Sequence, residues 1–216
     1  MTVAGLGPLL DRAPVIPVLT LDDPATAVNV AKALVAGGLP VLEVTLRTAA
    51  ALDAVRAIVA EVPGAVVGVG TILAPAQFDQ AIAAGAQFAV SPGHTPDLLA
   101  AAVASGLPYL PGMATASEAM ALYERGYQEL KFFPAEASGG VRFLRALLAP
   151  MPTLRFCPTG GIEAANASTY LALPNVACVG GSWTAPAETI RQGAWGRIED
   201  MARAAAGLRP SVARAN

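Results

Sequence analysis

Residues 15–45 read VIPVLTLDDPATAVNVAKALVAGGLPVLEVT, and this stretch decides the fold. A β-rich apolar run at 15–20 precedes an alanine-rich run at 24–36, and a second apolar run follows at 40–45. The alanine-rich run begins with proline, which suits the first turn of a helix, and Gly37 stands where a helix should stop. This order predicts two parallel strands joined by a helix.

The same alternation continues along the chain and predicts eight strands. The expected strands are 15–20, 40–45, 65–70, 88–91, 109–111, 128–133, 154–158 and 176–180. The expected helices are 24–36, 49–61, 75–84, 96–104, 116–125, 141–148 and 163–171. Such βα units in 216 residues fit a compact TIM (β/α)8 barrel.

We expect this barrel to be a single α/β domain over residues 1–216, with a short N-terminal helix and a C-terminal helix. The alanine-rich tail should begin as helix at Met201 and fray near Pro210. The alternative is an open doubly wound sheet. Its glycine-rich fingerprint is missing, because Thr20-Leu-Asp-Asp-Pro24 follows the first strand.

Composition and charge narrow the class of partner. The chain is 54% hydrophobic, which is enough to bury the core of one α/β domain. Its formal net charge is −2 and its arginines are scattered, so there is no basic footprint for nucleic acid or an anionic membrane. We expect small molecules or further copies of the chain as partners.

No segment predicts a membrane helix or an export signal. The uncharged stretch 98–117 is long enough to raise the question, but two glycines and two prolines between positions 106 and 112 interrupt it. Residues 1–8 lack the basic stretch and apolar core of a signal peptide. We therefore expect a cytoplasmic protein without membrane association.

Metal-binding residue types are too few to predict a metal site. Cys157 and Cys178 lie in apolar strand-like segments, which suits reduced core thiols better than a disulfide or metal ligands. His94 is the only histidine, so no second imidazole can complete a site. We assign His94 no role.

The strongest chemical signal is a lysine inside an apolar segment, Glu129-Leu-Lys-Phe-Phe-Pro134. The chain has two lysines and twelve arginines, so a general need for positive charge does not explain Lys131. An arginine would stay protonated there, whereas apolar surroundings disfavour the charged form of a lysine. Because a neutral amine condenses with ketones, we predict that Lys131 is a covalent nucleophile.

Glu43 is the acidic counterpart of Lys131. It stands within the apolar strand 40–45, whereas most other carboxylates fall in helices or turns. Such a carboxylate can relay protons while a Schiff base forms and a carbon–carbon bond breaks. The alternative is a structural ion pair, which is costly to bury and adds little stability.

Other polar residues follow strand ends, where the active sites of barrels form. Arg47 can direct its planar guanidinium to a substrate carboxylate or be an ordinary surface arginine. Thr71 can add a hydroxyl to the same carboxylate or cap the helix near Pro75. Paired glycines in Thr159-Gly-Gly161 and Gly180-Gly-Ser182 allow close backbone approach and favour a phosphate.

Taken together, these residues resemble the 2-keto-3-deoxy-6-phosphogluconate (KDPG) aldolase family, which includes bifunctional 4-hydroxy-2-oxoglutarate (KHG) aldolases. The segments that carry the resemblance are Leu42-Glu-Val-Thr-Leu-Arg47, Gly70-Thr71, Ser91-Pro-Gly93, Lys131-Phe-Phe-Pro-Ala-Glu136, Arg155-Phe-Cys-Pro-Thr-Gly-Gly161 and Gly180-Gly-Ser-Trp183. They follow in the family's order and span nearly the whole expected barrel.

The resemblance implies a class I aldolase, an aldehyde-lyase that cleaves KDPG to pyruvate and glyceraldehyde 3-phosphate. It also implies cleavage of KHG to pyruvate and glyoxylate, a homotrimer, and no metal or organic cofactor. Lys131 would form the Schiff base, and Glu43 would act as general base and acid. The implied binding residues are Arg47 and Thr71 for the substrate carboxylate, Pro92 and Phe133 for the pyruvyl pocket, and Thr159, Gly160, Gly161, Gly181 and Ser182 for the phosphate.

Three rival functions use the same residues. The first is an aldolase for an unphosphorylated or galactonate-derived 2-keto acid, against which the glycine pairs and Ser182 favour a phosphate. The second is a phosphosugar epimerase or isomerase in which Lys131 acts without covalent attachment. The third is a non-catalytic sugar-phosphate sensor, which has little use for a buried base beside a buried amine.

Overall fold

The computed structural model describes residues 5–208 as an α/β fold whose paired strands all run parallel. The strands are β1 (Val15–Leu19), β2 (Val41–Thr45), β3 (Val66–Gly70), β4 (Phe88–Val90), β5 (Tyr109–Leu110), β6 (Gly112–Met113), β7 (Glu129–Phe132), β8 (Arg155–Pro158) and β9 (Val179–Gly181). The helices are α1 (Gly7–Leu10), α2 (Pro24–Ala36), α3 (Ala51–Glu61), α4 (Ala76–Ala83), α5 (Pro96–Ser105), α6 (Ala116–Glu124), η1 (Glu136–Ser138), α7 (Gly140–Leu147), α8 (Ala167–Leu171), α9 (Ala187–Arg191) and α10 (Trp195–Ala206).

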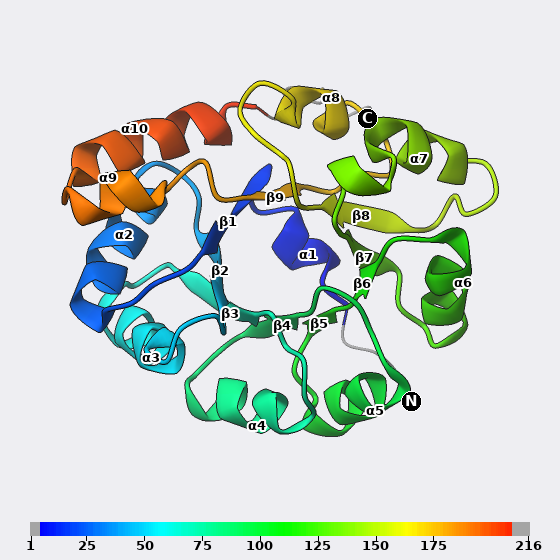
Figure 1. The fold of residues 1–216 in the computed structure, drawn as a ribbon, viewed down its shortest axis with the longest axis horizontal. Helices are drawn as coiled ribbons and strands as arrows, with labels where there is room; N and C mark the ends of the chain where they lie inside the picture. Colours follow the sequence, from blue (N-terminus) through cyan, green and yellow to red (C-terminus); the bar gives the residue numbers. More distant parts are fainter. Residues whose placement is uncertain (1–4, 209–216) are drawn as a thin grey trace.

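The strands form two parallel sheets. One has the order β5-β4-β3-β2-β1-β9 and curves as half of a barrel, and the other has the order β6-β7-β8. Single bridges from Phe156 to Val176 and from Thr159 to Gly180 connect β8 to the β9 segment. Figure 1 shows the strands around a central ring with α2 to α8 outside it. None of the helices within residues 5–208 is long and apolar enough to cross a membrane.

Seven of the eight expected strands correspond to single strands, and the expectation for 109–111 is wrong. This segment belongs to two strands, β5 and β6, on either side of Pro111. Proline has no N–H to donate to a ladder, so the pairing changes partner there. β5 pairs with β4, β6 pairs with β7, and the Pro111 carbonyl accepts from Lys131 N at 2.9 Å.

Six of the seven expected helices agree with the structure to within two residues, and helix 163–171 begins later, at Ala167. The Asn166 side chain accepts from Glu163 N at 2.8 Å and donates to the Gly161 carbonyl at 2.9 Å. These bonds hold residues 163–166 in a turn that competes with helix. The short helix α9 and the 3-10 helix η1 were not expected.

Both terminal helices were expected, but the C-terminal one begins at Trp195 and not at Met201. Its buried residues include Ile198 and Ala202, and it packs closely on α2, where Ala202 lies against Gly37. Tertiary packing therefore extends the helix beyond the alanine-rich tail. The predicted fraying near Pro210 lies outside the described residues.

Three helices, α2, α5 and α6, begin with a side-chain cap. Asp23 accepts from Thr26 N at 2.7 Å, a bond that lowers the pKa of the Asp23 carboxyl. Thr95 caps α5, and Thr115 forms a capping box with Glu118 at α6. Each cap satisfies amide groups that a helix start leaves open, so the chain turns sharply from strand to helix.

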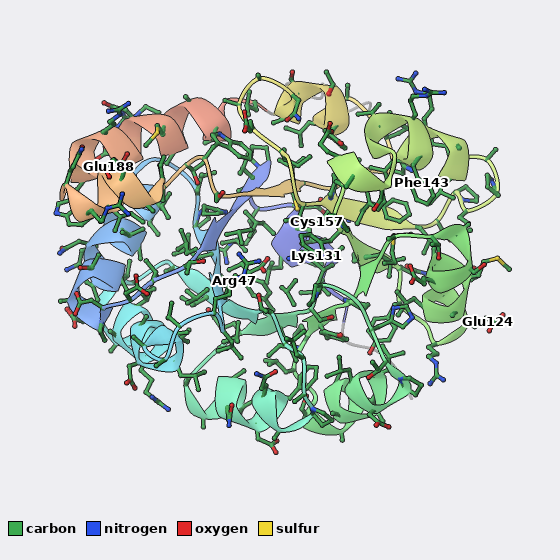
Figure 2. All side chains as sticks on the ribbon, in the orientation of Figure 1. Arg47, Glu124, Lys131, Phe143, Cys157 and Glu188 are labelled. Atoms are coloured by element: carbon green, nitrogen blue, oxygen red, sulfur yellow. The ribbon has the colours of Figure 1, made fainter. Side chains whose placement is uncertain are left out.

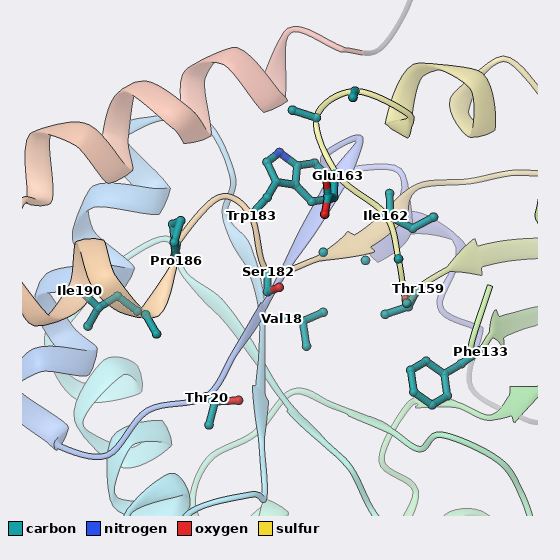
Figure 3. A pocket seen from close by; sticks show the side chains of 18 of the residues that line it. Val18, Thr20, Phe133, Thr159, Ile162, Glu163, Ser182, Trp183, Pro186 and Ile190 are labelled. Atoms are coloured by element: carbon teal, nitrogen blue, oxygen red, sulfur yellow. The ribbon is translucent and has the colours of Figure 1, made fainter. Parts of the chain in front are cut away.

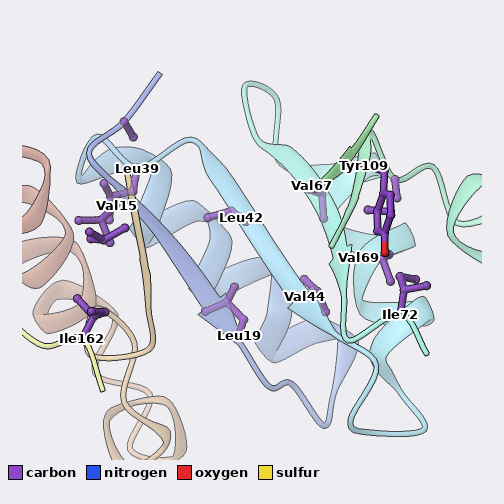
Figure 4. Close-up of a cluster of buried hydrophobic side chains, with 14 of the residues drawn as sticks. Val15, Leu19, Leu39, Leu42, Val44, Val67, Val69, Ile72, Tyr109 and Ile162 are labelled. Atoms are coloured by element: carbon purple, nitrogen blue, oxygen red, sulfur yellow. The ribbon is translucent and has the colours of Figure 1, made fainter. Parts of the chain in front are cut away.

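Strand alternation divides the core into two clusters. Leu42, Val44, Val67 and Val69 point outward and pack beneath the helices (Figure 4), as part of the larger cluster. The intervening residues near the strand starts, such as Val41, point inward and pack with Leu6 and Leu10 around α1. Because side chains alternate, Glu43 on β2 also points into the ring, above this inner cluster.

Candidate active site

Lys131 and Glu43 meet inside the ring. Lys131 Nζ lies 3.0 Å from Glu43 Oε1 and 3.3 Å from Oε2, and the two residues are 5% and 4% exposed. Lys131 lies on β7, where its neighbours Leu130 and Phe132 pack outward, and Glu43 lies on β2. The amine therefore has one carboxylate within proton-transfer distance and little water around it.

Gly70 on β3 makes room for the Glu43 carboxylate. A Cβ atom on Gly70 would lie 2.2 Å from Glu43 Oε1, which no real contact allows. Gly70 also pairs with Thr45, two residues beyond Glu43 on β2. Glycine at this position is thus a packing requirement of the ion pair.

Phe133 and Pro92 are the two residues predicted to line a pyruvyl pocket around Lys131. Lys131 Nζ is 5.7 Å from the centroid of the Phe133 ring, within the range of a cation–π contact. The Pro92 backbone packs on Gly112, which is the β6 partner of Lys131 in the parallel register. Phe133 therefore lies beside the amine, and the Pro92 backbone packs against the strand next to the one that carries Lys131.

The segment 91–93 that carries Pro92 is held from behind. Ser91 Oγ donates to the Gly93 carbonyl, so it accepts from the Tyr109 hydroxyl. Both Ser91 and Tyr109 are buried. Burial raises the pKa of the Tyr109 phenol above its ordinary value of 10.0, so this donor keeps its proton well above neutral pH.

Thr71 directly follows β3, and its backbone has a φ of 62°, the only positive value of a non-glycine residue in the described part of the chain. A β-branched residue rarely adopts this conformation, and such strain tends to occur at functional sites. The alternative that Thr71 caps a helix is wrong. No side chain caps α4, and Gln77 Oε1 accepts from Leu73 N and Ala74 N.

An open pocket of about 780 Å³ lies next to the Lys131–Glu43 pair, since Phe133, which contacts Lys131, lines it. Of the predicted site residues it is lined by Arg47, Phe133, Thr159, Gly160, Gly161, Gly181 and Ser182. Arg47 forms no ion pair within residues 5–208 and points toward the centre of the ring in Figure 2, whereas Glu188 lies on the outer rim. Arg47 is an exposed residue that lines the pocket, so its guanidinium is accessible to a ligand there.

The turn after β8 presents open backbone donors. Gly160 and Gly161 have φ values of 98° and 76°, which only glycine adopts readily. The amides of Gly161 and Ile162 donate to no acceptor within the described residues. Because both glycines line the pocket, this turn can bind an anion through its backbone.

The outer side of this turn is fixed by η1 and α8. Glu136 N donates to the Gly160 carbonyl at 3.1 Å, and a Cβ atom on Gly161 would lie 2.7 Å from Glu136 Cγ. The Tyr170 hydroxyl donates to Glu136 Oε1. Burial, and then this bond to Glu136, raises the pKa of the Tyr170 phenol. The glycine turn is therefore packed against a fixed support.

The second glycine pair makes the adjoining wall. Gly180 lies beneath the Thr159 hydroxyl, since a Cβ atom on Gly180 would lie 2.3 Å from Thr159 Oγ1. Gly181 lies beneath the Trp183 ring in the same way. Figure 3 shows Thr159, Ser182 and Trp183 around one pocket. The ends of β8 and β9 thus meet at one wall of the pocket.

The structure brings most of the predicted site together, but Lys131, Glu43, Thr71 and Pro92 lie outside the lining of the open pocket. Some lining residues had no expected role: Val18, Thr20, Ile162, Glu163, Ala164, Ala165, Trp183, Ala185, Pro186, Ala187 and Ile190. Thr20 could have been found, because it is a polar residue at a strand end. The apolar residues carried no such signal.

His94 and the cysteines take no part in this pocket. His94 Nδ1 lies 2.9 Å from the Gly112 carbonyl, and Cys157 and Cys178 are buried and unbridged. Within the described part of the chain, no three His, Cys, Asp or Glu side chains lie close enough to hold a metal ion.

Comparisons with known proteins agree with this geometry. The family model for KDPG and KHG aldolases matches residues 8–201. The KHG/KDPG aldolase of Escherichia coli is 53% identical over 197 residues, which cover 91% of this chain and 92% of that protein.

Solved structures are similar over the same length. A KDPG aldolase from Legionella pneumophila, with pyruvate captured as a covalent carbinolamine, has a TM-score of 0.91 and 45% identity, covering 94% of this chain and 98% of that one. A Zymomonas mobilis KDPG aldolase with 3-phosphoglycerate has a TM-score of 0.89 and 46% identity, covering 95% and 97%.

The fold, the buried lysine and these similarities together define the class of this protein: it is an aldolase, that is, a carbon–carbon lyase. More particularly, the chain belongs to the KDPG and KHG aldolase family, because the family model matches most of its length.

Proposed function

We propose that this protein is a class I aldolase that cleaves KDPG to pyruvate and glyceraldehyde 3-phosphate, and KHG to pyruvate and glyoxylate. The observation that carries the proposal is the buried contact of 3.0 Å between Lys131 Nζ and Glu43 Oε1. Family membership supplies the reaction, and this contact supplies a nucleophile with its own base.

Lys131 and Glu43 divide the chemistry. Glu43 takes a proton from the ammonium, and the free amine adds to the C2 ketone. Glu43 then returns protons so that the carbinolamine loses water and leaves an iminium. When Glu43 accepts the proton of the C4 hydroxyl, the C3–C4 bond breaks and its electrons pass into the iminium to form an enamine. Protonation at C3 and hydrolysis release pyruvate and the amine.

The other predicted residues bind the substrate in this proposal. Arg47 and Thr71 hold the carboxylate, and Pro92 and Phe133 enclose the pyruvyl group. Thr159, Gly160, Gly161, Gly181 and Ser182 receive the phosphate, supported by the open amides of the turn after β8. The 3-phosphoglycerate in the Zymomonas mobilis structure is a phosphorylated ligand of a relative and supports the same class of ligand here.

We also propose a closed eight-stranded barrel, a homotrimer and a cytoplasmic location. The bridges between β8 and the β9 segment, and the bond from Lys131 N to the Pro111 carbonyl, support closure. Exposed apolar side chains on and beside helices α3 to α6 support contact with further copies of the chain. They are Val59, Leu73, Ile82, Val103, Met120 and Tyr123.

Borohydride trapping tests the covalent step. In the presence of pyruvate, reduction should attach the substrate carbons to the peptide that contains Lys131. Lys131→Arg should abolish trapping and lower kcat roughly 10³-fold or more, as removal of a nucleophile does.

Lys32, the other lysine, is exposed on α2 and offers the matched control. Lys32→Arg should trap pyruvate as the wild type does. An active protein that never traps would support the epimerase alternative, and turnover retained by Lys131→Arg would refute the assignment.

A further inference from the structure

Thr20 is a pocket residue with no place in the scheme above. It directly follows β1 and lines the open pocket together with Val18 and Arg47. In the register of β1 and β2, Val18 lies opposite Glu43. Thr20 is two residues further on, so it lies about 6–7 Å nearer the mouth of the pocket than Glu43 does.

The hydrogen bonds around Thr20 determine what its hydroxyl can do. Thr45 is fully buried, and its Oγ1 donates to the Leu19 carbonyl at 2.9 Å. Thr20 Oγ1 lies 3.1 Å from Thr45 Oγ1. A hydroxyl has one proton, so Thr45 can only accept in this second bond and Thr20 must donate. The lone pairs of Thr20 Oγ1 are left to face the pocket as an acceptor.

Thr20 also lies between two different binding surfaces. β1 is flanked by β2, which leads to Arg47, and by β9, which leads to Ser182. Figure 3 shows Thr20 on the same side of the pocket as Val18 and Ser182, across from Phe133. Arg47, whose guanidinium suits a substrate carboxylate, therefore lies on one side of Thr20. The segment with Ser182, which suits a phosphate, lies on the other side.

We propose that Thr20 is a specificity residue that accepts a hydrogen bond from the C5 hydroxyl of a six-carbon 2-keto acid phosphate. The inference rests on the proposed function, in which Glu43 engages the C4 hydroxyl. C5 carries the next hydroxyl toward the phosphate, and Thr20 is the next polar group toward the mouth. The five-carbon substrate KHG has a carboxylate at C5 and no hydroxyl to donate to Thr20.

Two variants and two substrates test this role. Thr20→Val keeps the shape and removes the hydroxyl, so kcat/KM for KDPG should fall by about 5- to 10-fold, the effect of one hydrogen bond. kcat/KM for KHG should stay within about twofold of the wild type, since the lost contact does not exist there. Thr20→Ser keeps the acceptor and should stay within about twofold on both substrates.

The outcomes separate the two proposals. If the wild-type protein cleaves neither substrate, the proposed function fails and the role of Thr20 fails with it. If the wild type cleaves both but Thr20→Val leaves their ratio of kcat/KM unchanged, the role of Thr20 alone is refuted. Equal losses for Thr20→Val and Thr20→Ser on KDPG refute it too, because serine retains the hydroxyl. Thermal unfolding of each variant shows that the fold is intact.

Discussion

The contact between Lys131 and Glu43 depends on a residue that carries no chemistry of its own. Gly70 faces the Glu43 carboxylate closely enough that any side chain there would displace it. The φ of Gly70 is not positive, so alanine fits its backbone conformation. The requirement for glycine is one of space, and substitution should act on the carboxylate and not on the fold.

Gly70→Ala should lower kcat by about 10²-fold, because a shift of about 1 Å in a catalytic group has an effect of this size. The measurement is steady-state kinetics of pyruvate release, combined with Glu43→Gln in a double-mutant cycle. If Gly70 acts through Glu43, Gly70→Ala should add little in the Glu43→Gln background. Fully additive losses would contradict this explanation.

At the scale of elements, the turn after β8 combines two backbone requirements. Gly161 has a positive φ and also packs on Glu136, so it is constrained in conformation and in space. Three hydrogen bonds hold the turn in place. The Glu136 amide donates to the Gly160 carbonyl, and the Asn166 side chain donates to the Gly161 carbonyl. The Tyr170 hydroxyl in turn donates to the Glu136 carboxylate. The amides of Gly161 and Ile162, which have no acceptor within the described residues, remain available to a ligand.

Gly161→Ala should impair phosphate binding more than the covalent step. Left-handed backbone costs a non-glycine residue about 1–2 kcal/mol, so the turn should relax and KM for KDPG should rise about 5- to 30-fold. Trapping of pyruvate, which has no phosphate, should be unchanged.

Gly196→Ala is the matched control, since Gly196 lies in α10 with nothing near its would-be Cβ atom. It should leave KM unchanged and stabilise the helix by up to about 1 kcal/mol. A loss of pyruvate trapping in Gly161→Ala that equals its loss of KDPG cleavage would contradict a role in phosphate binding.

At the scale of the whole molecule, buried phenols couple stability to pH. Burial raises the pKa of Tyr109 above 10.0, so the folded protein keeps this proton to higher pH than the unfolded chain does. Above about pH 10 the unfolded chain therefore binds fewer protons, and the free energy of unfolding falls as the pH rises. The stability is complete below the unfolded pKa of 10.0.

Urea unfolding between about pH 9 and 11 measures this effect, which for one tyrosine reaches about 1.4 kcal/mol per pH unit. Tyr109→Phe should make the decline above pH 10 shallower by that slope. Parallel curves for the wild type and Tyr109→Phe would refute the coupling.

Much of the architecture was predictable because its signals are local. The spacing of apolar residues predicted the bounds of helices α2 to α7 to within two residues. The paired glycines indicated the turns that follow β8 and β9. The split at Pro111, the turn at Asn166 and the earlier start of α10 were not predictable. The split at Pro111 and the start of α10 depend on partners far along the chain, whereas the turn depends on two side-chain bonds of Asn166 that compete with helix locally.

The sequence by itself determined the order of strands and helices, the singular position of Lys131 and the family to which the chain belongs. These follow from residue types and their spacing. Tertiary structure alone decided that Lys131 meets Glu43 across 88 residues, that Gly70 leaves room for this pair, and that Thr20 offers an acceptor to the pocket. The physical reason is register: which side chains face each other inside the ring depends on how separate strands align.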